Sequence, residues 1–247
     1  MVMTREQLGL LLLIPAVAGL IAYAGLLRAR RWPALARLLS GHLTFLAALA
    51  LSLSPQLLAY KILNGRYGPS ATVAGKLDWR SPHFFDTLLD PAHGALLWSP
   101  VLALGLVGLI WLARQDRLLA ALLLLGFVAQ TYLNGAFGTT WHLSGAFGFR
   151  RLIECTPIIV LGLACLLDWA KAKVGIWPLL LIGLLLVYWN LGLIAQWTVV
   201  RKAEGFRLGL IWDNMLYYQF VEVPGQVASR LFDLIFNRCK FVTNQGC

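Results

Sequence analysis

The sequence predicts an all-α protein: a polytopic bundle of about six transmembrane helices, with an interfacial amphipathic helix near the C-terminus. Of its 247 residues, 59% are hydrophobic and only 13% are charged, about half the charged fraction of a soluble domain. Apolar runs recur that are long enough to cross a hydrocarbon core about 30 Å thick. The period-two alternation of barrel strands is absent, and an open sheet would leave backbone groups unpaired in lipid. These observations exclude soluble enzymes, zinc modules and secreted disulfide scaffolds.

Six apolar runs define the expected spans. The fourth and fifth contain only 16 residues each, so both are expected to take residues from the segment 134–151 between them, which can dip into the membrane. The first run is too long for a cleavable signal peptide, and its arginines lie on the wrong side. We therefore expect one transmembrane domain, residues 1–200, with spans near 8–27, 38–60, 94–113, 118–133, 152–167 and 176–200.

The remaining residues, 201–247, are expected to form a tail on the membrane surface. From Pro224 onward, apolar residues recur at helical spacing beside polar ones, a pattern typical of an interfacial helix. Pro224 suits the first turn because no backbone donor is needed there. Cys239 and Cys247 can form a disulfide only if the tail faces an oxidising compartment. The helical pattern comprises apolar Val227, Leu231, Leu234 and Ile235 with polar Arg230, Asp233 and Asn237.

The basic residues indicate how the helices are oriented. The net charge of +10 could suggest a nucleic-acid surface, but the basic residues are scattered through the links between apolar runs, where they anchor helices to lipid headgroups. Three short links are dense in positive charge, so we place them in the cytoplasm. This puts both termini, the loop 61–93 and the segment 134–151 on the outer face. The eight basic residues of these links are Arg28, Arg30, Arg31, Arg37, Arg114, Arg117, Lys171 and Lys173.

The strongest candidate site is a cluster at the start of the fifth span. Adjacent guanidiniums at Arg150 and Arg151, beside glycines that permit close backbone approach, suit a phosphate or pyrophosphate. Glu154 is placed to orient one arginine. The simpler interpretation is that the arginines only reach lipid headgroups and the glycines only allow tight helix packing. The cluster comprises Trp141, His142, Gly145, Phe147, Gly148, Arg150, Arg151, Glu154 and Pro157.

The loop 61–93 is a second candidate site. A carboxylate here could act as a general base toward a sugar hydroxyl beside a phosphate site, although loops are commonly polar because they are exposed. The spacing of His83, Asp90 and His93 matches no zinc pattern, and no cysteine pair assists. We expect no cofactor. A divalent cation bound between the loop acids and a lipid phosphate is kept as an alternative. The candidate loop residues are Asp78, Trp79, His83, Asp86, Asp90 and His93.

Two segments resemble those of a family of membrane enzymes. The nine residues from His93 to Val101, HGALLWSPV, are similar to the "HG, two or three apolar, W, S/T, P" segment of bacterial GT-C superfamily glycosyltransferases related to protein O-mannosyltransferases. The stretch from Trp141 to Pro157 is similar to their "W, G, FG, RR, acid, P" segment. A third, weaker similarity to the same family involves Asn214, Gln219, Phe220, Val223 and Pro224.

The resemblance implies a multi-pass protein of the bacterial inner membrane that uses a polyprenyl-phosphate sugar donor on the outer face. In such enzymes the catalytic acid generally lies in the loop after the first span, but the link 28–37 contains no carboxylate. The chain therefore resembles the C-terminal half of such an enzyme, and no catalytic residue is assigned. His142 and Leu143 depart from the aromatic and glycine pair often found there. The resemblance puts Arg150 and Arg151 near the donor phosphate, with Glu154, His93, Trp98, Trp141 and His142 in support.

A non-catalytic membrane subunit that packs against a larger membrane complex is the alternative. Small residues such as Gly105 and Gly108, or Gly183 and Gly192, indicate packing against helices within or between chains. A transporter is less favoured, because only Glu154 falls inside a span, near its end. The expected partners are membrane lipid, a polyprenyl-phosphate sugar donor and a second membrane chain supplying the N-terminal half, and not nucleic acid.

Overall fold

The computed structural model describes residues 6–80, 82–91, 93–138, 141–142, 147–200, 210, 212–229 and 231–236. Within these residues the regular elements are all helices, which confirms the predicted all-α class. Among the described residues, five helical stretches are long and apolar enough to cross a membrane. The chain is therefore an integral membrane protein. The five stretches are Gly9–Arg28, Trp32–Asn64, Arg117–Gly135, Arg150–Val174 and Ile176–Thr198.

The helices follow the predicted apolar runs closely. Short helices fill the loop between α2 and α6, and the π-helical segments η4 and η5 interrupt the last span and the tail. In chain order the elements are η1 (Glu6–Leu12), α1 (Leu13–Arg28), α2 (Trp32–Asn64), α3 (Ala71–Ala74), α4 (Phe84–Leu89), α5 (Ala95–Trp98), α6 (Pro100–Gln115), α7 (Arg117–Gly135), η3 (Arg150–Cys155), α8 (Thr156–Val174), α9 (Ile176–Ala195), η4 (Gln196–Val200), α11 (Met215–Tyr217), η5 (Tyr218–Glu222), α12 (Val223–Ser229) and α13 (Leu231–Phe236).

The third predicted span is wrong as a single helix. Residues 94–113 are divided into α5 and the 16-residue α6 by Ser99, whose backbone leaves the helical region (φ −134°, ψ 78°). Pro100 causes the break, because the proline ring disfavours the α conformation in the residue before it. The segment α6 is consequently shorter than a full membrane crossing.

The fourth and fifth spans are lengthened, as their short runs require. Helix α7 reaches 19 residues by adding Arg117 at its start and Asn134 and Gly135 at its end. The Asp116 carboxylate caps its start by accepting a hydrogen bond from the Leu119 backbone N–H (2.9 Å). The fifth span gains Arg150 and Arg151 at its start, in the 3₁₀ helix η3, and residues 168–174 at the end of α8. The region 134–151 thus contributes to both spans, as expected.

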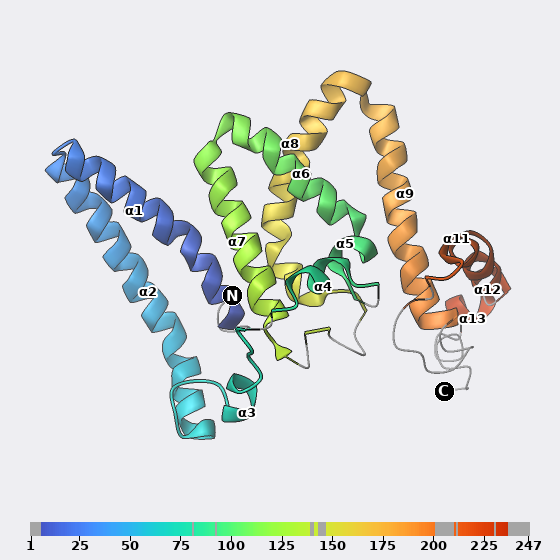
Figure 1. Cartoon of the computed structure of the whole chain (residues 1–247), viewed down its shortest axis with the longest axis horizontal. Helices are drawn as coiled ribbons and strands as arrows, with labels where there is room; N and C mark the ends of the chain where they lie inside the picture. Colours follow the sequence, from blue (N-terminus) through green and yellow to red (C-terminus); the bar gives the residue numbers. More distant parts are fainter. Residues whose placement is uncertain are drawn as a thin grey trace.

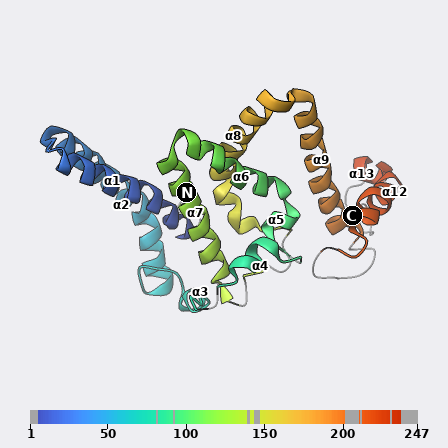
Figure 2. The ribbon, with the colours of Figure 1, turned by 45° about the horizontal axis from the view of Figure 1, so that its top comes forward.

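Helices α6, α7 and α8 form the centre of the molecule, with the α1–α2 hairpin on one side and α9 with the tail on the other (Figures 1 and 2). In the most apolar stretch of α7, 56% of the residues are buried, whereas the most apolar stretch of α2 contains no buried residue. The interior of the protein is thus the α6–α7–α8 unit. Its main core side chains are Leu109, Leu112, Leu123, Phe127, Phe149, Leu152, Ile158 and Ile159.

Glycines let α6 and α8 touch backbone to backbone. A Cβ added at Gly108 would overlap the carbonyl group of Gly162, and one at Gly105 would come within 2.8 Å of the Ile159 carbonyl oxygen. The small-residue pattern predicted to mark helix packing therefore serves a contact within the chain. Gly192 packs against the Gln219 side chain, whereas an added Cβ at Gly183 would meet nothing within 4 Å.

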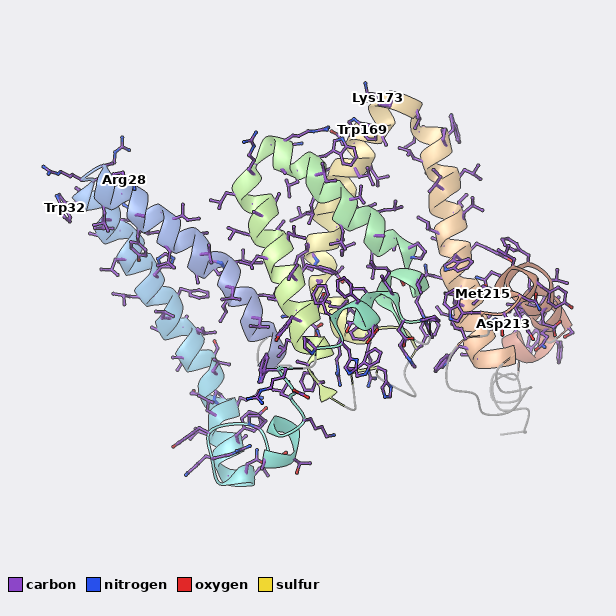
Figure 3. The ribbon with its side chains drawn as sticks, in the orientation of Figure 1. Arg28, Trp32, Trp169, Lys173, Asp213 and Met215 are labelled. Atoms are coloured by element: carbon purple, nitrogen blue, oxygen red, sulfur yellow. The ribbon has the colours of Figure 1, made fainter. Side chains whose placement is uncertain are left out.

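Because successive helices alternate in direction, their links gather at two ends (Figure 1). The basic end carries the short links that follow α1, α6 and α8. The motif end carries the loop before α6, the residues after α7 and the tail. Figure 3 shows Arg28 and Lys173 at the basic end, and Asp213 and Met215 beside the opposite end of α9. Which end faces the cytoplasm stays a prediction.

The tail packs against α9 instead of only lying on a surface. Met215, Gln219 and Val223, spaced four residues apart, are all buried, and helical structure runs without a break from Met215 to Ser229. The α-helix α12 begins at Val223, which puts Pro224 in its first turn as predicted, but η5 and α11 extend helical structure back to Met215. Helix α13 still exposes apolar side chains, including Phe232. The predicted positions Arg230, Asn237, Cys239 and Cys247 and the segment 201–209 lie outside the described residues.

Candidate functional site

The candidate site surrounds the C-terminal end of α7, at the motif end of the molecule. The loop that precedes α6 folds across this helix end and is held there by its backbone. The Asp78 N–H donates to the Ala136 carbonyl oxygen (2.6 Å), and the His83 N–H donates to that of Gly135 (3.3 Å). The Tyr132 hydroxyl also donates to the Trp79 carbonyl oxygen (2.7 Å). Residues of both predicted candidate sites are thereby brought to the same helix end.

The two sequence segments that resemble one family meet in an aromatic cluster, which we define as His93, Trp98, Phe147 and Trp197. His93 and Trp98 are each 2% exposed, and their rings stack with centroids 5.7 Å apart. Phe147, from the second segment, lies edge-on to Trp98 at 5.0 Å. Trp197 of η4 lies 5.7 Å from Trp98. Sequence reasoning missed Trp197, which lies near the end of the last apolar run and looks there like an ordinary interfacial tryptophan.

Hydrogen bonds tie this aromatic cluster to the tail and to α9. The Pro91 carbonyl oxygen accepts from the indole N–H of Trp98 (3.1 Å) and from that of Trp212 in the tail. The Ser99 hydroxyl donates to Asn190 Oδ1 of α9 (3.1 Å). Four separate parts of the chain therefore converge on one buried group of rings.

The two adjacent arginines have different surroundings. Arg151 is half-buried, and its guanidinium lies 4.5 Å from the centroid of the Phe137 ring. The Asn134 side-chain amide, in the last turn of α7, donates to the Arg151 carbonyl oxygen (3.4 Å). Arg150 is exposed, as expected for neighbours in a 3₁₀ helix, whose side chains point about 120° apart. Glu154, one turn later, is half-buried.

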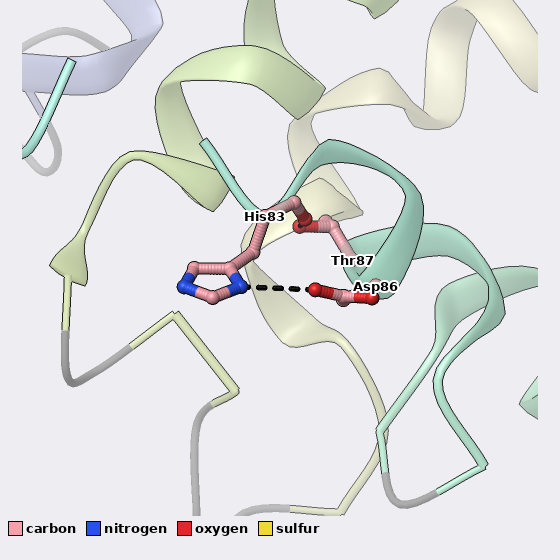
Figure 4. Close-up of polar contacts among 3 residues, drawn as sticks. All are labelled: His83, Asp86 and Thr87. Atoms are coloured by element: carbon pink, nitrogen blue, oxygen red, sulfur yellow. Dashed lines mark hydrogen bonds and ion pairs between the residues drawn. The ribbon is translucent and has the colours of Figure 1, made fainter. Parts of the chain in front are cut away.

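An imidazole and a carboxylate of the loop form a close pair. His83 Nδ1 lies 2.9 Å from Asp86 Oδ2 (Figure 4). Trp141 of the second segment stacks on the His83 ring, with centroids 4.7 Å apart and planes inclined by 14°. Of the other predicted loop acids, Asp78 accepts from the Arg80 backbone N–H (3.0 Å). Sequence reasoning named the members of this loop without pairing them.

Ring contacts connect the paired imidazole with the aromatic cluster. His142 lies 5.6 Å from Trp141 and 6.2 Å from His93, measured between ring centroids. His142 departs from the family pattern, yet it occupies the position that joins the two groups. The predicted cluster residue Gly145 and its neighbour Leu143 lie outside the described residues. Within the described part of the chain, no group of three or more histidine, cysteine, aspartate and glutamate side chains is placed to hold a metal ion.

An apolar groove of about 960 Å³ opens between α8 and α9, with α6 behind it. Its walls run from Asp168 and Lys171 near the basic end to Asn190 near the motif end. Asn190 also accepts the hydrogen bond from Ser99, the residue after Trp98. The groove therefore runs along the helices from near the basic end toward the aromatic cluster.

Comparison of the chain with protein-family models, with curated proteins and with solved structures found no match. The family resemblance accordingly depends on the two sequence segments described above.

Proposed function

We propose that this chain is the C-terminal half of, or a partner chain in, a membrane glycosyltransferase that takes its sugar from a polyprenyl phosphate at the outer face of the bacterial inner membrane. The observation that carries the proposal is the contact between the two resembling segments. The ring centroids of Trp98 in the first segment and Phe147 in the second lie 5.0 Å apart, and those of His93 and His142 lie 6.2 Å apart. Two segments with 39 residues between them, 93–101 and 141–157, thus meet at one end of the membrane helices.

The charge at this site suits a phosphodiester. Arg151 presents a permanently charged, planar guanidinium at the end of α7, half-buried against Phe137. Removal of a guanidinium from bulk water strengthens its attraction for phosphate oxygens. Arg150, exposed next to it, adds positive charge where an anionic lipid would approach. Arg151 is therefore the principal phosphate ligand in this proposal, and Arg150 has a secondary role.

The apolar groove between α8 and α9 supports a lipid-linked donor. Its lining is almost entirely aliphatic, with Leu163, Leu167, Leu180 and Val187 among its walls. An isoprenoid chain lying there would gain from burial of its apolar surface, and its phosphate would lie toward the motif end.

The exposed hairpin of α1 and α2 supports a second membrane chain as partner. The most apolar stretch of α2 has no buried residue, and that of α1 is only 6% buried. Membrane helices commonly gain stability by packing against one another through close contacts. The same observation favours the alternative of a non-catalytic subunit, which would use the hairpin to join a larger complex.

Alanine substitution of the arginines tests the proposal. R151A and R150A are made in the full chain, and sugar transfer from polyprenyl-phosphate sugars is measured in membranes that contain it. The matched control is R114A, because the Arg114 guanidinium also lies over a ring, that of Trp111 at 5.5 Å, but at the basic end. Loss of a half-buried phosphate ligand should cost about 1.5–3 kcal/mol, so R151A should transfer about 10- to 100-fold less.

Unchanged transfer in both R150A and R151A would contradict the proposal. Purification in mild detergent separates it from the alternative. A chain that isolates only within a complex, whose transfer activity survives both substitutions, is a non-catalytic subunit.

A further inference from the structure

We infer that His83, oriented by Asp86, is the general base that removes the proton from the acceptor hydroxyl; this inference rests on the proposed glycosyl transfer. The sequence leads to the expectation of a carboxylate in this role. The structure places Asp86 behind an imidazole instead, because Asp86 Oδ2 lies 2.9 Å from His83 Nδ1. An Asp–His pair of this kind is a recurring way to prepare a histidine for proton abstraction.

The pairing fixes which ring nitrogen can accept a proton. A carboxylate only accepts hydrogen bonds, so His83 Nδ1 carries the proton and donates to Asp86. Nε2 of the neutral ring then carries the lone pair. Figure 4 shows Nε2 at the edge of the ring opposite Asp86. Because histidine gains and loses a proton near neutral pH, this nitrogen suits a general base.

The backbone of His83 is held rigidly, as a positioned base requires. Its N–H donates to Gly135 at the end of α7, and its carbonyl oxygen accepts from the Thr87 hydroxyl (2.6 Å) and the Thr87 N–H (2.9 Å). Thr87 is fully buried. A Cβ on Gly135 would come within 3.0 Å of the His83 carbonyl group, so the glycine allows this close seating.

The base and the proposed phosphate ligand share one anchor. His83 is hydrogen-bonded to Gly135. Arg151 is hydrogen-bonded through its carbonyl oxygen to Asn134, the preceding residue, and its guanidinium covers Phe137. Both are therefore attached to a stretch of four residues at the end of α7. Trp141, stacked on His83, provides an aromatic side chain beside them against which a sugar ring can pack.

The proposed step conserves atoms and charge. The acceptor oxygen forms a bond to the anomeric carbon of the donor sugar, and its proton passes to His83 Nε2. The bond between the anomeric carbon and the phosphate oxygen breaks, and the electron pair leaves with the polyprenyl phosphate, which becomes a dianion. Asp86 stabilises the imidazolium that forms, and Arg151 stabilises the charge that develops on the leaving phosphate.

Other titratable or charged groups surround His83. They are Tyr132 of α7, Asp78 and Arg80 of the preceding loop, and His142 beside Trp141. Arg150, Arg151 and Glu154 belong to η3, which packs against α7. Tyr132 and Asp78 are already bonded to backbone atoms of Trp79 and Arg80. Asp86, by contrast, is hydrogen-bonded directly to the imidazole.

Kinetics of single and double variants test the inference. H83Q, D86N and the double variant H83Q/D86N are made in the full chain, and transfer from polyprenyl-phosphate sugars is measured against pH. D213N is the control, because Asp213 is another exposed carboxylate at the same end of the protein. Binding of a polyprenyl phosphate, which His83 does not contact in the proposed site, reports whether each variant is folded.

We expect H83Q to lower kcat by about 100-fold or more, with KM for the donor nearly unchanged. A general base acts only in its unprotonated form, so the pH dependence of transfer should differ between the wild type and H83Q. D86N should lower kcat by about 10- to 100-fold. The double variant should have a kcat no lower than that of H83Q, because the two side chains act as one unit.

Three results would overturn the inference. Transfer by H83Q within threefold of the wild type excludes His83 as the base while leaving the glycosyltransferase proposal intact. Losses that multiply in the double variant show that Asp86 does not act through His83. Absence of transfer in the wild type with every donor tested defeats both the proposed function and this inference.

Discussion

Replacement of Gly108 by alanine should loosen the contact between α6 and α8. A Cβ at this position would overlap the carbonyl group of Gly162 on the facing helix. The added Cβ and the Gly162 carbonyl group are both attached directly to a helix backbone, so the two backbones must separate. The helices carry much of the protein core, including Leu109 on α6 and Ile158 on α8. A local substitution therefore disturbs the packing of the whole central unit.

The size of the effect follows from the geometry. Ordinary van der Waals contact begins near 3.4 Å, so G108A requires the backbones to move apart by more than about 1 Å. Overpacking of this kind costs about 1–3 kcal/mol, and alanine returns up to about 1 kcal/mol through its higher helix propensity. We expect a net loss of about 1–2 kcal/mol for G108A. G108L, which adds three more carbons, should lose more.

Unfolding by SDS in mixed detergent micelles, followed by tryptophan fluorescence, measures these differences. G183A is the matched control, because an added Cβ at Gly183 meets nothing within 4 Å. It should leave the free energy of unfolding unchanged or slightly raise it. Equal stability of G108A, G108L and the wild type would refute the reasoning, and so would an equal loss in G183A.

Two further predictions concern the tail and the topology. Q219L should raise the rate of proteolysis within the tail several-fold, because the buried Gln219 side chain donates a hydrogen bond to the Trp189 carbonyl oxygen of α9 (2.6 Å). Q226L is the control, and equal rates of cleavage in the two variants would contradict the prediction. In a cysteine-free background, a membrane-impermeant maleimide added to intact cells should label D213C but not K173C, whose positions lie at opposite ends of the helices. The reverse pattern would invert the orientation derived from the basic links.

The spans could be predicted because membrane helices must carry long continuous apolar runs. The run 176–200 corresponds to α9 with η4, and the short fourth and fifth runs are lengthened as expected. The failure at 94–113 has a local cause, because hydropathy takes no account of the effect of Pro100 on the backbone of Ser99. Pro224 lies in the first turn of α12, as its preference for that position predicts. The helical residues before it, from Met215 to Glu222, could not be predicted because they depend on burial against α9.

The candidate site could be predicted only as a list of residues. The sequence placed His93, Trp98, Arg150 and Arg151 in two segments, but hydropathy and motif spacing give no side-chain directions. The different exposure of the two arginines follows from the 3₁₀ turn at η3, which no sequence signal marks. The His83–Asp86 pair depends on α4, a helix too short to produce a clear pattern, seated on Gly135.

Binding of a polyprenyl phosphate to the purified chain, measured against the same polyprenol without phosphate, tests most directly whether Arg151 holds an anionic lipid. The wild type should prefer the phosphate, and R151A should lose this preference through a Kd about 10- to 100-fold weaker. R114A should bind as tightly as the wild type. Equal affinity for polyprenol and polyprenyl phosphate, or an unchanged Kd in R151A, would contradict the proposed site.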